Sequence, residues 1–234
     1  MRKLFGFLFA LVAVLSLASC GGKVEGALTY DEYVAAENGV EVTIAGYVQG
    51  KQGWWEDNGV GKATVYLQDN DGGYFLYELT CTEEQYNNDL AIGNHIKVTG
   101  IKGEWAGMVE IMCQEAGAEA TYEVLKGNKV FKAVKAESLD NEALIKLSCQ
   151  KVAFKNLEVV KVDLPQSEGK DIYFDVTDGT NTLTFAIESY LTGKNTDVYQ
   201  TVWGLKAGDK INCEGFMYVY NKAQLHTTSV ELVK

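Results

Sequence analysis

The chain has 234 residues, of which 47% are hydrophobic, and a formal net charge of -11. So acidic a chain disfavours general binding to a phosphate backbone, because that binding draws most of its affinity from Lys and Arg. With 24 Gly, 13 Tyr and a single Pro, its composition is typical of one or two cores built from strands and tight turns rather than from helices.

Residues 1–19 predict a signal peptide. Arg2 and Lys3 form a charged start, and residues 4–17 are an apolar run too short to span a membrane comfortably. The motif Leu17-Ala18-Ser19-Cys20 resembles the lipobox of bacterial lipoproteins. This resemblance implies that Cys20 is lipidated and that the peptide is cut just before it. The alternative is an ordinary signal peptide that happens to end near a cysteine.

Residues 20–28 are expected to be a lipidated tether, because residues 21–27 show no apolar pattern. Several acyl chains make a lasting membrane anchor, since each buried methylene contributes about 0.8 kcal/mol. Gly21 is not the aspartate that keeps lipoproteins on the inner membrane in the enterobacterial sorting rule, so the resemblance implies the outer membrane or cell surface. Without the leader, 19 basic and 32 acidic residues remain, a net charge of -13.

Each half of the remaining chain is expected to open with a short helix. Thr29 and Glu32 form a capping box for a helix that runs through Ala36. In the second half, Ser138 precedes a similar helix that ends near Ile145. The two halves therefore begin in the same way.

Five predicted strands follow each helix in the same order. Apolar alternation and hairpin turns predict the first three strands, at residues 40–48, 63–68 and 74–79 and at residues 151–159, 171–176 and 182–187. A polar, partly helical connection follows in each half, at residues 82–89 and 189–200. The fourth strands form a repeat, in which a glycine turn, an alternating strand and a closing glycine occur at residues 90–100 and again at 205–215. The fifth strands are expected at residues 108–113 and 223–230.

This order, with its helical link between the third and fourth strands, resembles the OB-fold, a five-stranded Greek-key barrel. The phrase IGNHIKVTG after VYLQDNDGGYFLYEL also resembles OB-type domains of bacterial extracytoplasmic proteins. We therefore expect an all-β chain of two tandem OB-fold-like barrels, domain 1 at residues 29–120 and domain 2 at 138–234, joined by a linker at 121–137. A different all-β sandwich is the alternative.

Motifs that carry catalytic chemistry are missing from the sequence. His95 and His226 have no Gly-x-Ser-x-Gly, His-x-x-x-His or Cys-x-x-Cys pattern near them, and we interpret both as structural or solvated. The run Asp69-Asn70-Asp71-Gly72 is explained by a hairpin turn, because the glutamate that closes a calcium loop is not at the required spacing. Acids are plentiful, but nothing isolates a pair in an apolar setting. We therefore expect no enzymatic activity, no metal and no small-molecule cofactor.

Aromatic residues mark the candidate ligand-binding site. In an OB-fold the ligand face is flanked by the loop after strand one and the loop between strands four and five. Those loops hold Trp54 and Trp55 and, facing them, Trp105 in domain 1, and Tyr218 and Tyr220 in domain 2. Such rings can stack on sugars or bases or anchor a protein interface. The alternative is that the tryptophans fold back over a barrel end or pack between the domains.

The four cysteines after Cys20 are even in number, which in an exported protein invites disulfides. By OB topology we expect Cys81 to pair with Cys113 and Cys149 with Cys213. The competing interpretation is that all four are buried free thiols that serve as small apolar residues.

The leading interpretation is a membrane-anchored, non-enzymatic binding or scaffold lipoprotein of the cell envelope, with a protein or glycan partner. One alternative is a nucleic-acid-binding OB protein, which fold analogy suggests and the charge opposes; a basic groove in the structure would revive it. The other is an accessory or hydrolytic component of a cell-envelope enzyme system, which requires a pocket with converging polar groups.

Overall fold

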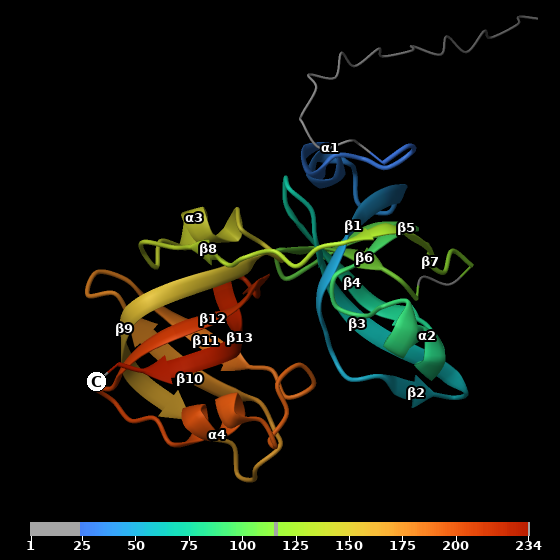
Figure 1. Ribbon diagram of the computed structural model, residues 1–234. Helices are drawn as coiled ribbons and strands as arrows, with labels where there is room; N and C mark the ends of the chain where they lie inside the picture. Colours follow the sequence, from blue (N-terminus) through green and yellow to red (C-terminus); the bar gives the residue numbers. More distant parts are fainter. Residues whose placement is uncertain (1–23, 115–116, 234) are drawn as a thin grey trace, which may run out of the picture.

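The computed structural model describes residues 24–114 and 117–233, which form two β-barrels side by side (Figure 1). The lipobox, Cys20 and the expected signal peptide lie outside the described residues. Within the described part, no helix has both the length and the apolar character needed to cross a membrane.

Barrel 1 is a closed circuit of five strands. Its elements are α1 (Tyr30–Ala35), β1 (Glu41–Lys51), β2 (Trp55–Asp57), β3 (Val60–Gln68), β4 (Gly73–Thr80), α2 (Glu83–Asn88), β5 (Asn94–Trp105), β6 (Met108–Met112) and β7 (Thr121–Asn128). The strands pair in the order β1-β3-β4-β6-β5, and β5 pairs again with β1. Only the contact between β4 and β6 is parallel.

Barrel 2 repeats this circuit. Its elements are β8 (Val134–Lys135), α3 (Asn141–Ile145), β9 (Lys151–Asp163), β10 (Ile172–Thr177), β11 (Thr182–Ile187), α4 (Asp197–Trp203), β12 (Lys210–Val219) and β13 (Ala223–Leu232). The order is β9-β10-β11-β13-β12, closed by β12 on β9, with a parallel contact between β11 and β13. The expected fold of two tandem OB-fold-like barrels is confirmed, because each circuit has the OB strand order and a helix between its third and fourth barrel strands.

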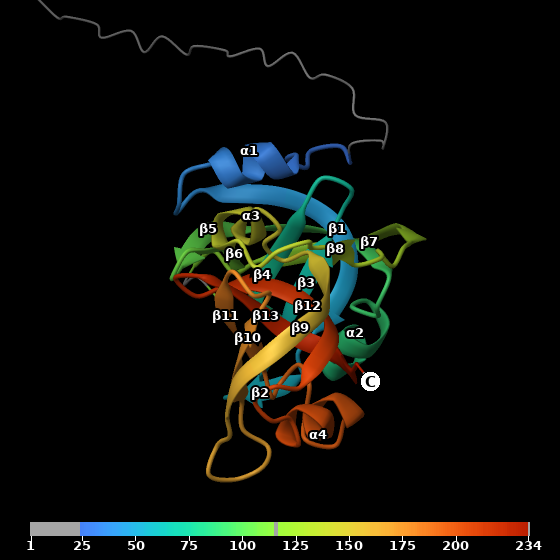
Figure 2. The same cartoon turned by 90° about the vertical axis from the view of Figure 1, so that its left-hand side faces the viewer.

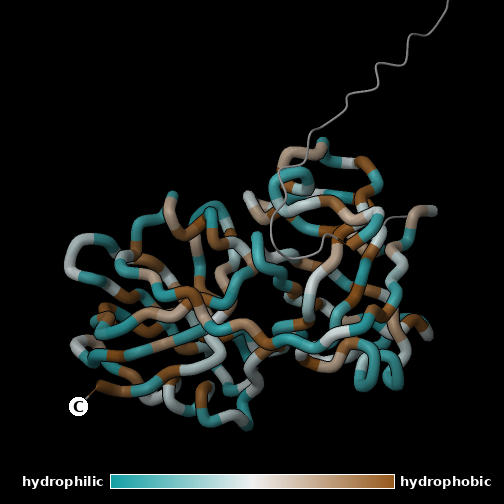
Figure 3. The backbone as a smooth tube through the Cα atoms, turned by 45° about the horizontal axis from the view of Figure 1, so that its top comes forward, coloured by the Kyte–Doolittle hydropathy of each residue, from teal (hydrophilic) through white to brown (hydrophobic). Residues whose placement is uncertain are grey.

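Local sequence explains these elements. In β5, Ile96 and Val98 point into the barrel while their neighbours face outward, as the period of a strand requires. Figure 3 shows this mixture of hydrophobic and hydrophilic residues along the strands of both barrels. The capping box of Thr29 and Glu32 is present at the start of α1, whereas α3 is capped by Asp140 rather than Ser138. Figure 2 shows α1 and α4 at opposite ends of the molecule.

The segment 121–137, expected to be a linker, adds a strand to each sheet. Its first half forms β7, which pairs antiparallel with β5, and its second half contains β8, which pairs parallel with β9. The expected loop after β1 contains the short strand β2, which pairs with the start of β3. Backbone hydrogen bonds therefore hold both segments against the barrels.

The four described cysteines are free and buried, so the expected bridges are wrong and the competing interpretation holds. The register of β4 and β6 places Cys113 beside Glu78. Cys81 lies three residues further along the chain from Glu78, so the two cysteines are about 10 Å apart. Cys149 lies beside Met217, four residues along β12 from Cys213. A disulfide needs Cα atoms within about 7 Å, and these separations exceed that reach.

Candidate ligand-binding site

The outer face of β3 and β4 in barrel 1 is covered by barrel 2. Tyr66 and Phe75 on this face pack against Phe216 and Val219 of barrel 2 in a buried cluster. Tyr66 stacks on Phe216 with ring centroids 4.5 Å apart. A Cβ built on Gly50 would overlap the ring of Phe216, so glycine permits this close approach. The part of an OB barrel that commonly receives a ligand is therefore an interface between the domains in barrel 1.

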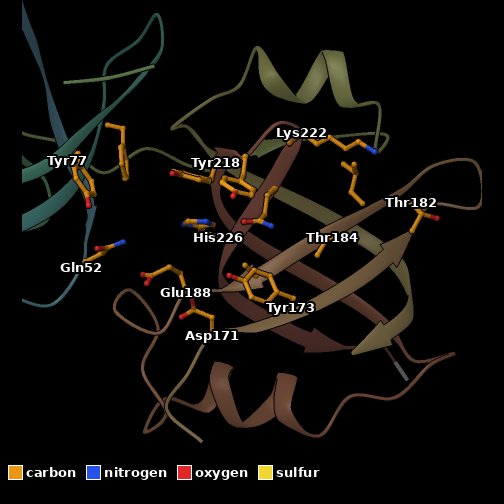
Figure 4. Close-up of a pocket in the computed structure, with 16 residues that line it drawn as sticks. Gln52, Tyr77, Asp171, Tyr173, Thr182, Thr184, Glu188, Tyr218, Lys222 and His226 are labelled. Atoms are coloured by element: carbon orange, nitrogen blue, oxygen red, sulfur yellow. The ribbon is translucent and has the colours of Figure 1, made fainter. Parts of the chain in front are cut away.

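The equivalent face of barrel 2, formed by β10 and β11, is open. It forms one wall of a cavity of about 610 Å³ between the barrels (Figure 4). The hairpin that joins β12 and β13 forms a second wall, and Gln52, Phe75 and Tyr77 of barrel 1 complete the lining. This volume lies within the range of small-molecule sites in proteins, roughly 300 to 1,000 Å³.

Strand alternation positions the aromatic ring on the floor of the cavity. In β10, Ile172 and Phe174 point into the core of barrel 2, so Tyr173 between them points outward and is 42% exposed. Tyr173 is paired across the sheet with Ala186 of β11. Because alanine is small, the space above it stays open beside the tyrosine ring.

The hairpin between β12 and β13 supplies two more rings. Tyr218 is held in place, because it stacks on His226 with centroids 4.3 Å apart and meets Phe75 of barrel 1 edge-on at 5.6 Å. Tyr220 at the tip is 55% exposed. Together with Tyr77 and Tyr173, the cavity thus has four tyrosines, of which Tyr218 is the most firmly packed.

His226 connects the cavity to the domain interface. Its Nδ1 atom lies 2.8 Å from the hydroxyl oxygen of Tyr66. Burial lowers the pKa of His226 to about 4 and raises the pKa of Tyr66 well above its ordinary value. At neutral pH an uncharged phenol is therefore hydrogen-bonded to an uncharged imidazole, which in turn stacks on the ring of Tyr218.

Two carboxylates lie next to each other in the lining of the cavity, because Asp171 directly precedes β10 and Glu188 directly follows β11 at the same end of this antiparallel pair. Asp171 accepts a hydrogen bond from the backbone N–H of Ser189 at 2.9 Å. Glu188 accepts two, from the backbone N–H groups of Tyr190 and Leu191. Burial is the main cause that raises the pKa of Glu188, and the nearby Asp171 adds to it. Both carboxylates shape the turn after β11 and still face the cavity (Figure 4).

The three predicted tryptophans do not converge. Trp54 folds back against the core of barrel 1, and its indole N–H donates to the carbonyl oxygen of Cys81 at 3.0 Å. Trp55 is 37% exposed and lies beneath the ammonium group of Lys62, 4.8 Å from the ring centroid. Trp105 is 62% exposed, and its backbone is paired with Met108 in the β5–β6 hairpin. This hairpin lies at the opposite end of the β3–β4–β6 sheet from Trp55. The register separates Trp105 from Trp55 by seven residues along the strands, more than about 20 Å, and neither ring lines the cavity.

Two of the predicted residues, Tyr218 and Tyr220, do line the cavity, but other lining residues were missed. Tyr173, Tyr77, Asp171 and Glu188 were not selected from the sequence. Tyr173 carries a usable signal, since it alternates with Ile172 and Phe174 on a predicted second strand and must therefore face outward. Tyr77 has no such signal, because its role depends on the position of barrel 2.

No protein-family model matches the sequence, and no curated protein matches it. The p204 HINb domain is a similar solved structure, with 11% identity, 85% of this chain and 100% of that chain covered, and a TM-score of 0.36. A murine DNA-binding protein bound with double-stranded DNA has 13% identity and a TM-score of 0.37, and the match covers 82% of this chain and 95% of that chain. An asparaginyl-tRNA synthetase from Pyrococcus horikoshii has 17% identity and a TM-score of 0.34. The match covers 44% of this chain and only 23% of the synthetase chain. At TM-scores below 0.5 none of these likenesses supports a function for this chain.

Proposed function

We propose that this protein is a lipid-anchored, non-enzymatic glycan-binding protein of a bacterial cell envelope, with the glycan bound in the tyrosine-lined cavity. The observation that carries the proposal is the combination of four tyrosine rings with carboxylate and amide groups around one cavity between the barrels. Sugar rings have apolar C–H faces that stack on aromatic rings, and their hydroxyl groups donate to carboxylates and amides. OB barrels bind oligosaccharides and oligonucleotides on this face.

The charge of the cavity favours a glycan over a nucleic acid. Its lining contains the carboxylates of Asp171 and Glu188 but only one lysine, Lys222. His226 adds no charge at neutral pH, because its pKa is lowered to about 4. A phosphate backbone would meet net negative charge, whereas an uncharged sugar would find hydrogen-bond acceptors.

The hydrogen bonding of the two carboxylates supports binding rather than hydrolysis. A glycosidase needs one carboxylic acid that releases its proton and a second carboxylate that is free to act as base or nucleophile. Here Asp171 and Glu188 both accept hydrogen bonds from backbone N–H groups of residues 189–191. These bonds orient the two side chains as fixed acceptors.

The binding proposal is tested with neutral oligosaccharides of glucose, xylose and mannose, screened on an array and titrated by calorimetry against residues 24–233, which contain both barrels. Tyr173→Ala should weaken binding about tenfold, as expected for the loss of one stacking ring. Trp105→Ala is the matched control, since Trp105 is exposed and lies outside the cavity. Equal losses in both variants, or no binding of any neutral glycan, would contradict the proposal.

The membrane anchor is tested separately on the full chain. Metabolic labelling with palmitate should label the protein, and Cys20→Ser should abolish the label and leave the protein outside the membrane fraction. An unlabelled, soluble periplasmic protein would overturn the anchor but leave the glycan proposal intact.

A further inference from the structure

A second concave surface of the described chain is lined by lysines. It lies where the segment between the barrels runs along β9, and it has a volume of about 560 Å³. Four lysines line it, Lys132, Lys135, Lys151 and Lys155. We refer to it as the lysine groove. It is separate from the tyrosine-lined cavity and shares none of its lining residues.

The sequence around the lysine groove differs in charge from the rest of the chain. Residues 126–155 contain seven lysines and three acids, a net charge of +4, whereas the whole chain has -11. Such a local reversal in an acidic protein concentrates positive potential in one place. It would attract an anionic ligand that the remaining surface repels.

Strand register explains why these lysines surround a hollow. Lys135 of β8 is paired with Ala153 of β9, and Ala153 is paired on its other side with Glu214 of β12. Lys151 and Lys155 lie two positions on either side of Ala153, so they share its face of β9 and are separated by roughly 13 Å. The small alanine forms the floor, and the long lysine side chains form the walls.

Most of this positive charge is uncompensated. Lys151 forms an ion pair with Glu214, with an N–O distance of 3.5 Å. Among the residues that the structure describes, Lys132, Lys135 and Lys155 form no ion pair. Three ammonium groups therefore line one groove with only solvent to neutralise them, apart from the nearby Glu137.

We propose that the lysine groove binds an acidic polysaccharide through its carboxylate or sulfate groups. A single-stranded nucleic acid would also need exposed rings for its bases. The one aromatic residue here, Phe131, is half-buried, lies 6.1 Å from Tyr47 and is covered by the ammonium group of Lys129 at 4.0 Å. The described residues contain no arginine for bidentate contacts to bases.

The shape of the groove also favours a linear chain over a flat membrane surface. The lysines line a hollow rather than a flat patch. A flat bilayer cannot follow the floor of a hollow, whereas a single polysaccharide chain can.

The experiment titrates residues 24–233 with fluorescent oligogalacturonate and heparin oligosaccharides at low and at physiological ionic strength. We expect binding that weakens as salt rises, and a loss of about tenfold or more in the triple variant Lys132→Gln, Lys135→Gln, Lys155→Gln. The matched control is Lys170→Gln, Lys194→Gln, Lys206→Gln, which removes the same charge from exposed positions outside the groove. It should change affinity by less than about twofold.

Glu214→Gln gives an independent test with the opposite sign, because it frees Lys151 from its ion pair and should tighten binding. Equal losses in the two triple variants would show attraction by net charge alone and overturn the proposal. Failure of the wild-type chain to bind either acidic glycan would also overturn the proposal. The same holds if oligothymidylate binds as tightly as the acidic glycans and loses as much affinity in the groove variant. Tyr173→Ala should leave this binding unchanged, so the two sites can fail separately.

Discussion

The hydroxyl oxygen of Tyr66 in barrel 1 lies 2.8 Å from Nδ1 of His226 in barrel 2. These residues are 160 positions apart in sequence, and both are buried. Because His226 also stacks on Tyr218, one hydrogen bond joins the domain interface to the wall of the cavity. The geometry of the cavity wall in barrel 2 therefore depends on barrel 1.

Tyr66→Phe should destabilise the protein by about 1 to 3 kcal/mol, because the buried Nδ1 of His226 loses its hydrogen-bond partner. The free energy of unfolding, measured by chemical denaturation, checks this value. Tyr190→Phe is the matched control, since Tyr190 is strongly exposed and should change stability by less than about 0.5 kcal/mol. Equal effects in the two variants would show that the bond between the barrels contributes nothing.

The buried His226 should make the protein less stable in acid. Its pKa in the folded state, about 4, is below its ordinary value of 6.5, so its contribution is full above pH 6.5 and is lost as the pH falls towards 4. Between pH 7 and pH 4 the wild type should lose about 3 kcal/mol of unfolding free energy from this group, whereas His226→Gln should not. The difference in stability between the two proteins should therefore shrink by about that amount. Denaturation curves at both pH values measure this change, and a constant difference would contradict the assignment.

Glu110 should have the opposite effect. It lies on β6, is only 7% exposed, and burial raises its pKa to about 7. Nothing in the described part of the chain forms a hydrogen bond or ion pair with its carboxylate. Its contribution to stability is therefore full below about pH 4.5 and is lost as the pH rises through 7, where the carboxylate becomes charged.

Glu110→Gln removes this charge while keeping the shape of the side chain. At pH 8 the variant should be more stable than the wild type by about 1 to 2 kcal/mol, and at pH 5 the two should be alike. Glu104→Gln, at an exposed position on β5, should show no such dependence on pH. Thermal melts at the two pH values provide the measurement, and a variant that is less stable at pH 8 would refute the idea.

The close approach of the barrels at Gly50 should tolerate no side chain. A methyl group there would overlap the ring of Phe216, so Gly50→Ala should cost about 1 to 3 kcal/mol as the ring is displaced. Gly193→Ala serves as control, because a Cβ there makes only an ordinary contact, 3.6 Å from the carbonyl oxygen of Ser189. Equilibrium denaturation measures the free energy of unfolding of both variants. Equal values would mean that the Phe216 ring can move aside at little cost.

Local pattern, together with its resemblance to the OB-fold, predicted the two barrels. The alternation around Ile96 and Val98, the capping box of Thr29 and Glu32, and the repeated glycine turn at 90–100 and 205–215 each depend on residues close together in the chain. These signals place a side chain inside or outside its own barrel. They predicted the order of elements along the chain and the domain repeat, and the resemblance of that order to the OB-fold predicted how the strands pair. None of this needed any knowledge of how the two barrels meet.

The candidate site depended on contacts that no local pattern records. Tyr66 and Tyr173 both point outward from the second strand of their barrels, yet Tyr66 is fully buried by barrel 2 and Tyr173 lines an open cavity. Trp54 folds onto Gly61 and the Cys81 carbonyl instead of facing a ligand. The sequence by itself determined which residues leave each barrel core, whereas only the tertiary structure decided which of them stay exposed, because that depends on packing between residues more than a hundred positions apart.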